Sequence, residues 1–222
     1  MQAPDLFSIV DHYIDDLFAP EDEALSNALA LARAAGMDEI QVSAGQGKLL
    51  YLFARMAGAR RILEIGALGG YSAIWLARAL PEDGRMVTLE KEPRHAAVAE
   101  QALAGAGLST KVRVVVGPAT ETLPGVIEKA DAPFDLVFLD ADKVNYKDYM
   151  SQVMTRVRSG SLILADNVIR KGTVLAPSFD DPSAGAARDF NAMIAADDRL
   201  ETLVIQQVGV KGHDGLAIAR VK

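Results

Sequence analysis

The sequence contains no cysteine, which excludes disulfide bonds, thiolate metal sites and a cysteine nucleophile. This absence is compatible with a reducing compartment, and we expect a cytoplasmic location. No apolar run approaches the length that a helix needs to cross a membrane, and no basic segment followed by an apolar stretch marks a secretory signal. We therefore expect no membrane partner.

An excess of positive charge is also missing, because the formal net charge is −7 at pH 7. This balance offers no general attraction to nucleic acid, so it favours a small-molecule partner. The three histidines, His12, His95 and His213, are widely separated and lack the spacing of metal ligands, so we assign none to catalysis. A G-x-G-x-x-G motif is absent too, which opposes a nicotinamide-dependent oxidoreductase.

The chain does contain an alternation of strand-like runs and helical segments, which begins after Ala59 and is typical of stacked βαβ units. Half of the 222 residues are hydrophobic, and no linker or repeat divides them. We predict one α/β domain over 1–222, with a helical cover over 1–58 and an α/β core over 59–222. The last two strands, joined by a turn-rich loop, would form a hairpin that makes the sheet mixed. Strands are expected at 61–66, 85–90, 112–117, 134–140, 160–166, 200–208 and 215–221, and helices at 5–18, 21–35, 45–58, 71–80, 93–107, 119–130, 145–157 and 183–196.

Two of the apolar runs end abruptly in polar residues. The run from Phe134 ends at Asp140, and the run from Leu162 ends at Asp166 and Asn167. Because open α/β sheets bind ligands at the carboxyl ends of their parallel strands, these three side chains are expected to converge there. Two carboxylates and an amide oxygen suit a hard divalent cation such as Mg²⁺, Ca²⁺ or Mn²⁺ better than zinc or copper.

A simpler interpretation of these residues competes with the metal site. Asp140 or Asp142 would cap a helix that begins near Val144, and Asp166-Asn167 would form a turn. The occurrence of both acidic strand ends, with Lys143 alongside the first, favours the metal site.

A glycine-rich turn follows the first strand of the core, where Gly66 and Gly70 allow close approach of the backbone to a ligand. Glu64, just before this turn, suits a cationic or hydrogen-bond-donating ligand better than a pyrophosphate. Glu90 ends the next strand and is suited to accept both hydroxyl protons of a ribose. Together these residues indicate a ligand that carries a ribose and a cationic or hydrogen-bond-donating group.

In this combination and order the sequence resembles a known family, the cation-dependent O-methyltransferases of the catechol and caffeoyl-coenzyme A type, especially their small bacterial members. The resemblance covers roughly residues 38 to 222 and implies the Rossmann-like, seven-stranded fold of S-adenosylmethionine-dependent methyltransferases, with a terminal antiparallel hairpin. The segments that carry it are Glu64-Ile65-Gly66, Gly70-Tyr71-Ser72-Ala73, Glu90, Asp140-Ala141-Asp142-Lys143 and Asp166-Asn167-Val168.

The resemblance also implies roles for individual residues. Glu64 would meet the methionine ammonium of the cofactor, Glu90 its ribose and Ala119 its adenine edge. Asp140 would lie between the cofactor and the metal. The implied cofactor contacts are Val42, Glu64, Gly66, Ala67, Ser72, Glu90, Ala119 and Asp140, and the implied metal ligands are Asp140, Asp166 and Asn167.

Lys143 matches the catalytic lysine of the family, and it would either accept the proton of the substrate hydroxyl or support the oxyanion while remaining charged. The implied substrate is a small catechol-like aromatic with vicinal hydroxyls. Methylation of a hydroxylated RNA base, known in some bacterial relatives, is the alternative that the acidic balance opposes. Arg170 and Lys171 either line the substrate entrance or lie in a solvated loop.

The first predicted helix carries an apolar set that has two possible uses. It would bury a homodimer surface, as in many relatives, or pack within the same chain against the sheet. Its members are Leu6, Ile9, Val10, Ile14, Leu17 and Phe18.

Overall fold

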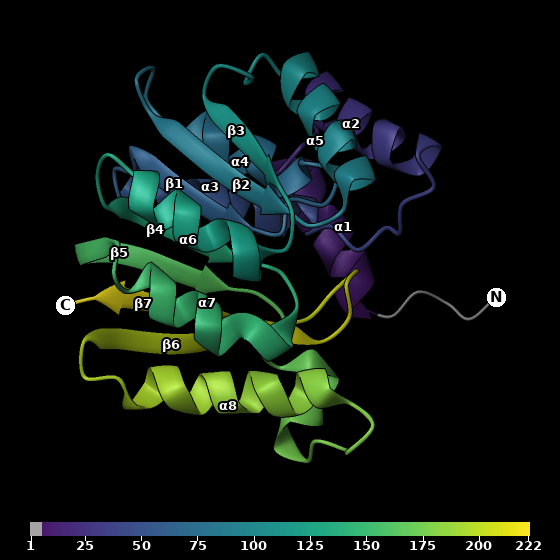
Figure 1. The fold of residues 1–222 in the computed structure, drawn as a ribbon. Coiled ribbons are helices and arrows are strands. Elements are labelled where there is room, and N and C mark those ends of the chain that lie inside the picture. The colour runs from purple at the N-terminus through teal and green to yellow at the C-terminus, as the bar shows by residue number, and fades with distance from the viewer. Residues whose placement is uncertain (1–5) are drawn as a thin grey trace.

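The computed structural model describes residues 6–222, so the first residue of the helix expected at 5–18 lies outside the described part. A seven-stranded sheet in the order β3-β2-β1-β4-β5-β7-β6 runs through the molecule, with helices on both faces (Figure 1). The five strands β1 to β5 are parallel, and β7 is antiparallel to both β5 and β6. The predicted mixed sheet with a terminal hairpin is confirmed. The strands are β1 (Arg61–Ile65), β2 (Arg85–Glu90), β3 (Val112–Val116), β4 (Phe134–Leu139), β5 (Val157–Ala165), β6 (Leu200–Gln207) and β7 (Asp214–Val221).

The central strand β4 is buried along its whole length, as expected of a parallel strand covered on both faces. Because successive side chains of a strand point to opposite faces, Leu136 and Phe138 join the core on one side, and Val137 and Leu139 join the core on the other. The sheet therefore separates two hydrophobic cores and holds its carboxyl ends rigidly.

The first core packs against α2 (Glu23–Ala34), α3 (Ala44–Met56), α4 (Tyr71–Ala79) and α5 (Pro93–Gly105), and the second against α6 (Ala119–Lys129), α7 (Tyr146–Val153) and α8 (Pro182–Ala196). The helix starts follow local chemistry. The Ser43 hydroxyl accepts the N–H of Gln46 at 3.2 Å and caps α3, while the Asp22 and Asp181 carboxylates cap α2 and α8 in the same way.

The predicted boundaries differ from the structure most clearly between 145 and 160. The helix expected at 145–157 ends at Val153, and the strand expected at 160–166 begins already at Val157. The reason is tertiary, because Val157 pairs with Phe134 and the Phe134 N–H donates to the Arg156 carbonyl at 2.9 Å. Short 3₁₀ segments, η1 (Lys143–Asn145) and η2 (Arg170–Leu175), follow the ends of β4 and β5.

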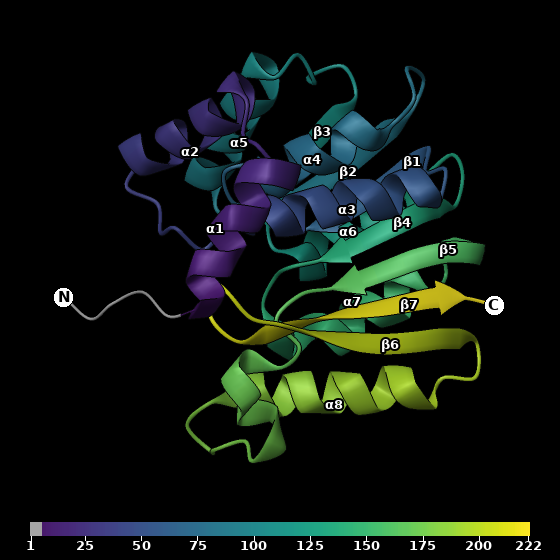
Figure 2. The ribbon, with the colours of Figure 1, turned by 180° about the vertical axis from the view of Figure 1, so that it is seen from behind.

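Helix α1 (Leu6–Phe18) buries none of its residues. It packs beside α3, and its Asp11 carboxylate accepts the N–H of Val210, in the β6–β7 loop, at 3.0 Å. Figure 2 shows this helix beside strands β5, β7 and β6, whose rear face carries no helix. In the part of the chain from 6 to 222, no helix is long and apolar enough to cross a membrane.

Candidate active site

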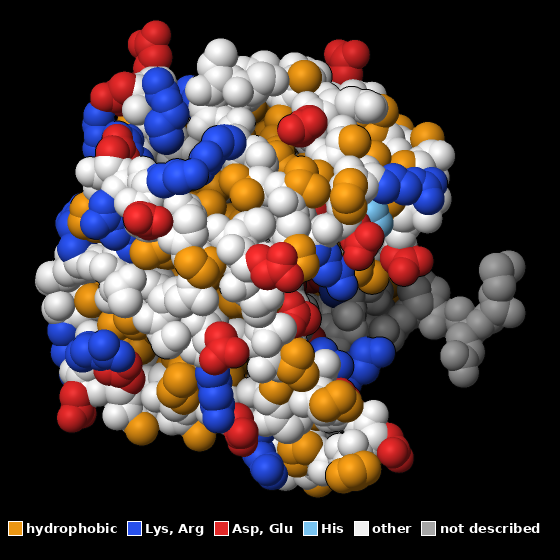
Figure 3. All heavy atoms as spheres, in the orientation of Figure 1, with side chains coloured by type: hydrophobic (Ala, Val, Ile, Leu, Met, Phe, Trp, Pro, Cys, Tyr) orange, Lys and Arg blue, Asp and Glu red, His pale blue; other side chains and the backbone are white. Residues whose placement is uncertain are grey.

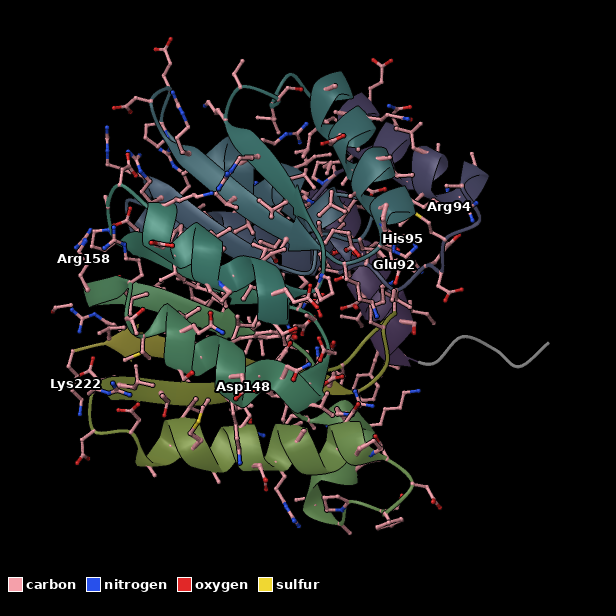
Figure 4. The ribbon with its side chains drawn as sticks, in the orientation of Figure 1. Glu92, Arg94, His95, Asp148, Arg158 and Lys222 are labelled. Atoms are coloured by element: carbon pink, nitrogen blue, oxygen red, sulfur yellow. The ribbon has the colours of Figure 1, made fainter. Side chains whose placement is uncertain are left out.

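A cavity of about 1400 Å³ opens at the carboxyl ends of the parallel strands. Acidic and basic side chains gather together at this edge of the molecule (Figure 3). Glu92 and His95, at the start of α5, lie at the same edge, whereas Arg158 and Lys222 mark the opposite one (Figure 4). The strand ends thus present polar groups to a space large enough for a nucleoside-containing ligand and a second small molecule.

Backbone hydrogen bonds align the strand ends that face the cavity. The N–H of Asp140 donates to the carbonyl of Ile65 at 2.9 Å, and the N–H of Asp166 donates to that of Leu139 at 2.9 Å. Gly66 has a φ of +105°, and a Cβ there would lie 2.0 Å from the carbonyl oxygen of Asp140. Only glycine fits at this position, so the glycine turn also brings β1 and β4 into close contact.

Glu64 lies one layer behind the cavity and is fully buried. Its carboxylate accepts the Ser72 hydroxyl at 2.6 Å and the Thr88 hydroxyl at 2.5 Å. Burial raises the pKa of Glu64 to about 7, and the two hydrogen bonds oppose that rise. Since Ser72 lines the cavity and Glu64 does not, a direct contact of Glu64 with a cofactor ammonium stays a prediction.

Glu90 lies on the cavity wall, where it organises the glycine turn. Its carboxylate accepts the N–H of Leu68 at 2.7 Å and that of Glu92 at 3.0 Å. Leu68 has a φ of +47°, a left-handed conformation that is rare for leucine and is stabilised here by this hydrogen bond. His95 lies 3.8 Å from Glu90 and also lines the cavity, a neighbour that the sequence did not indicate.

Asp140 and Asp166 face the other end of the cavity. Asp166 is only 4% exposed, and burial together with the negative charge of Asp140 raises the pKa of Asp166 to about 7. Its carboxylate accepts the N–H of Asn167 at 2.8 Å, and no turn is formed at Asp166 or Asn167. The capping interpretation fails for Asp142, whose carboxylate accepts the Tyr149 hydroxyl at 2.7 Å and makes no capping bond.

Lys143 is the cation beside this acidic pair, and its side chain is only 6% exposed. Its ammonium lies 3.4 Å from the Asp140 carboxylate and donates to the Ala141 carbonyl at 2.9 Å and to the Tyr146 hydroxyl at 2.7 Å. A surface lysine is therefore excluded. Arg170 also lines the cavity, whereas Lys171 does not.

The structure gathers most of the residues that the sequence nominated. Around the cavity lie Val42, Gly66, Ala67, Ser72, Glu90, Ala119, Asp140, Lys143, Asp166 and Asn167, and Glu64 lies behind them. Sequence reasoning missed Gln46 of α3, which lines the cavity with its Nε2 buried and whose side chain interacts with the Asp166 carboxylate. It also missed Tyr146, which contacts Lys143. Only the short spacing from Lys143 to Tyr146 could have suggested the second.

Comparison with known proteins agrees with this geometry. The family model described as O-methyltransferase matches residues 18–222. A catechol O-methyltransferase of Niastella koreensis is 48% identical over 217 residues, which is 98% of each chain. A catechol O-methyltransferase of Mycobacterium tuberculosis is 49% identical over 213 residues, covering 96% of this chain and 95% of the relative.

A solved structure shares the whole fold. It is the O-methyltransferase TomG of Streptomyces achromogenes, involved in tomaymycin synthesis, in complex with S-adenosylmethionine. It superposes with a TM-score of 0.95 at 43% sequence identity, and the match covers 100% of both chains.

Proposed function

This chain belongs to the O-methyltransferase family, and we propose that it methylates one hydroxyl of a small catechol-like aromatic with the help of a divalent cation, Mg²⁺. The family match makes it an S-adenosylmethionine-dependent O-methyltransferase and excludes the nicotinamide-dependent alternative. The catechol-like substrate is supported by the names of the two relatives, and the cation by the residues at the acceptor end of the cavity.

The observation that carries the proposal is the pair of acids forced together at the ends of β4 and β5. Two carboxylates lie beside the single Lys143 ammonium, and the pKa of the buried Asp166 is still raised to about 7, so the site favours a further positive charge. Among residues 6–222 no group of three or more His, Cys, Asp or Glu could hold a metal, and the third protein ligand that we propose is the amide oxygen of Asn167, which lines the cavity beside Asp166. Asp140, Asp166 and Asn167 thus offer oxygen donors of the kind that Mg²⁺ prefers, and they leave room for substrate oxygens and water.

A bound cation would supply Lewis acidity, which lowers the pKa of the substrate hydroxyl. The residues of the chain would do the remaining work. Glu90 and Ser72, which line the cavity, would hold the cofactor, and Asp140 would lie between the cofactor and the metal. Transfer forms the bond between the acceptor oxygen and the methyl carbon while the sulfur–methyl bond breaks and its electron pair stays on sulfur. The hydroxyl proton leaves either to Lys143 as a neutral amine or to solvent, and in the second case the Lys143 ammonium supports the oxyanion.

The test follows a labelled methyl group from S-adenosylmethionine to catechol before and after EDTA treatment. We expect chelation to abolish transfer and Mg²⁺ to restore it, while calorimetry shows that the cofactor still binds. Asp166→Ala should reduce transfer more than cofactor binding, and the matched control Asp148→Ala, which removes an exposed carboxylate of α7, should change neither. Full activity in the verified absence of divalent ions would overturn the metal assignment, and no methylation of any catechol would overturn the substrate class.

For the partner, we propose a second copy of this chain, which would cover α1. The six apolar side chains expected from the sequence to form this surface are between 40% and 70% exposed, namely Leu6, Ile9, Val10, Ile14, Leu17 and Phe18. Nearby, Leu203 and Ile205 of β6 are 62% and 41% exposed on the sheet face opposite α8. Clustered apolar surface of this kind is typical of an interface, and a two-fold axis would let each copy cover the other.

Light scattering at micromolar concentration tests the dimer. We expect the parent to be a dimer, the double variant Ile9→Glu/Leu17→Glu to be a monomer, and the control Leu175→Glu to stay a dimer. Leu175 lies in η2 and is 87% exposed, so Leu175→Glu makes the same apolar-to-acidic change at an exposed position outside α1. A monomeric parent would contradict the proposal.

A further inference from the structure

Tyr146 is fully buried beside the acceptor site, and the methyl transfer outlined above does not use its hydroxyl group. It is the first residue of α7, and its ring packs edge-on against Phe190 of α8, with ring centroids 5.2 Å apart. Its hydroxyl lies 2.8 Å from the carbonyl of Leu139 and 3.2 Å from that of Asp166. Packing and hydrogen bonding therefore fix this hydroxyl against the ends of both strands that carry the acidic pair.

The hydrogen bonds of Tyr146 set the direction of its contact with Lys143. A phenol has one proton, and both strand-end carbonyls can only accept, so that proton is directed to them. The lone pairs of the hydroxyl remain for Lys143, whose Nζ lies 2.7 Å away. Lys143 must therefore donate to Tyr146, and its Nζ cannot turn away without losing a buried hydrogen bond.

A second short bond, from Lys143 Nζ to the carbonyl of Ala141 at 2.9 Å, fixes the amine from another side. An ammonium has three donors, and these two acceptors take two of them. The third donor is left for the Asp140 carboxylate, which lies 3.4 Å away and lines the same cavity. A lysine otherwise has a long flexible side chain, so this arrangement selects one position among many.

We propose that Tyr146 is the positioning residue for Lys143, holding its Nζ at the acceptor oxygen through a buried hydroxyl anchored on β4 and β5. Tyr146 itself touches neither cofactor nor substrate in this proposal. The inference rests on the proposed function for the identity of the acceptor, but the hydrogen bonds that carry it do not depend on the substrate.

Tyr146→Phe tests this role because it keeps the ring against Phe190 and removes only the hydroxyl. We expect kcat for catechol to fall about 10- to 100-fold, the range found when partners that orient active-site ligands are removed. KM and the affinity for S-adenosylmethionine, measured by calorimetry, should stay within about twofold. The control Tyr51→Phe, which removes a hydroxyl from α3 outside the cavity lining, should retain the parent kcat.

The double variant separates positioning from simple stabilisation of the fold. In the Lys143→Ala background, Tyr146→Phe should have no further effect on kcat, because the group that it positions is gone. An equal loss in both backgrounds, or an unchanged kcat with a lower melting temperature, would overturn the inference.

A crystal structure of Tyr146→Phe gives a readout independent of activity. Displacement of Lys143 Nζ supports the role, and an unmoved Nζ contradicts it, even if the parent methylates no catechol and the proposed substrate class fails.

Discussion

Replacing Glu64 by glutamine should stabilise the cofactor-free protein at alkaline pH and at the same time weaken cofactor binding. The carboxylate is fully buried, and its main compensation comes from the hydroxyls of Ser72 and Thr88. Glutamine has nearly the same shape, and either hydroxyl can turn to accept its amide N–H. The substitution therefore removes a buried charge with little change in packing.

The size of the effect follows from the pKa of Glu64, which is raised from the ordinary 4.5 to about 7. At about 1.4 kcal/mol per unit, this shift corresponds to about 3 kcal/mol. Because the folded state holds the proton more tightly than the unfolded state, the stability contributed by Glu64 is complete below pH 4.5 and is lost as the pH rises through 7. At pH 8 the variant should be more stable than the parent by about 3 kcal/mol, and below pH 4.5 the two should be nearly equal.

Urea unfolding of both proteins between pH 4.5 and 8 measures this difference. Asp166, with its own raised pKa, changes the stability of the parent in the same direction, and its contribution cancels between parent and variant. The control Glu201→Gln, which neutralises an exposed partner of Arg220, should show a nearly constant difference. A parent–variant difference for Glu64→Gln that does not grow with pH would refute the reasoning.

The same charge should appear in the pH dependence of cofactor affinity. A carboxylate with a pKa of about 7 is half ionised at pH 7 and about one-tenth ionised at pH 6, while the cofactor α-ammonium stays charged over this range. The affinity of the parent for S-adenosylmethionine should therefore fall about fivefold from pH 7 to pH 6. In Glu64→Gln the affinity should be lower and nearly constant, and an equal slope in both proteins would exclude Glu64 as the partner of the ammonium.

Two further substitutions test the cofactor wall and the packing behind it. Glu90→Ala should weaken S-adenosylmethionine binding about 10- to 100-fold, measured by calorimetry. The substitution removes charge-assisted acceptors for the ribose and leaves the N–H of Leu68 unpaired. An unchanged affinity would contradict the ribose assignment. Gly47→Ala should lower the free energy of unfolding by about 1–3 kcal/mol, because the added Cβ would lie 2.3 Å from the Trp75 ring. The control Gly185→Ala places a methyl group in open space on a helix and should raise the free energy of unfolding by about 0.5–1 kcal/mol. Equal effects at the two glycines in urea unfolding would show that helix propensity, and not the contact with Trp75, sets the cost.

The sheet could be predicted from the sequence because its signals are local. Runs such as Leu136–Leu139 are apolar throughout, as burial on both faces requires, and a glycine turn or an acidic residue follows them. The end of the helix before β5 could not be predicted in the same way. Nothing within 145–157 marks Val153 as its last residue, because the boundary depends on pairing between Val157 and Phe134, which lie 23 residues apart.

The sequence could likewise predict some features of the acceptor site and not others. Asp140 and Asp166 could be nominated because the carboxyl ends of neighbouring parallel strands must meet, whatever the side chains between them. That Asp166 is buried and Glu64 lies behind the cavity depends on how helices pack over the sheet. The role of Tyr146 depends on carbonyls at the ends of two strands, so the sequence could suggest it only through the short spacing from Lys143 to Tyr146.

The loop after Asp166 shows how far a site can depend on a distant segment. Asn167, Arg170 and Lys171 all have φ between +51° and +55°, a conformation that only asparagine among them favours. Asp214, at the start of β7, accepts the backbone N–H of Arg170 at 2.8 Å and that of Ile169 at 3.1 Å, and so holds the loop in this form. Because β7 enters the sheet antiparallel beside β5, its first residue arrives at the edge where the parallel strands end. The terminal hairpin therefore does more than complete the sheet, since it fixes the backbone from which Asn167 and Arg170 face the cavity.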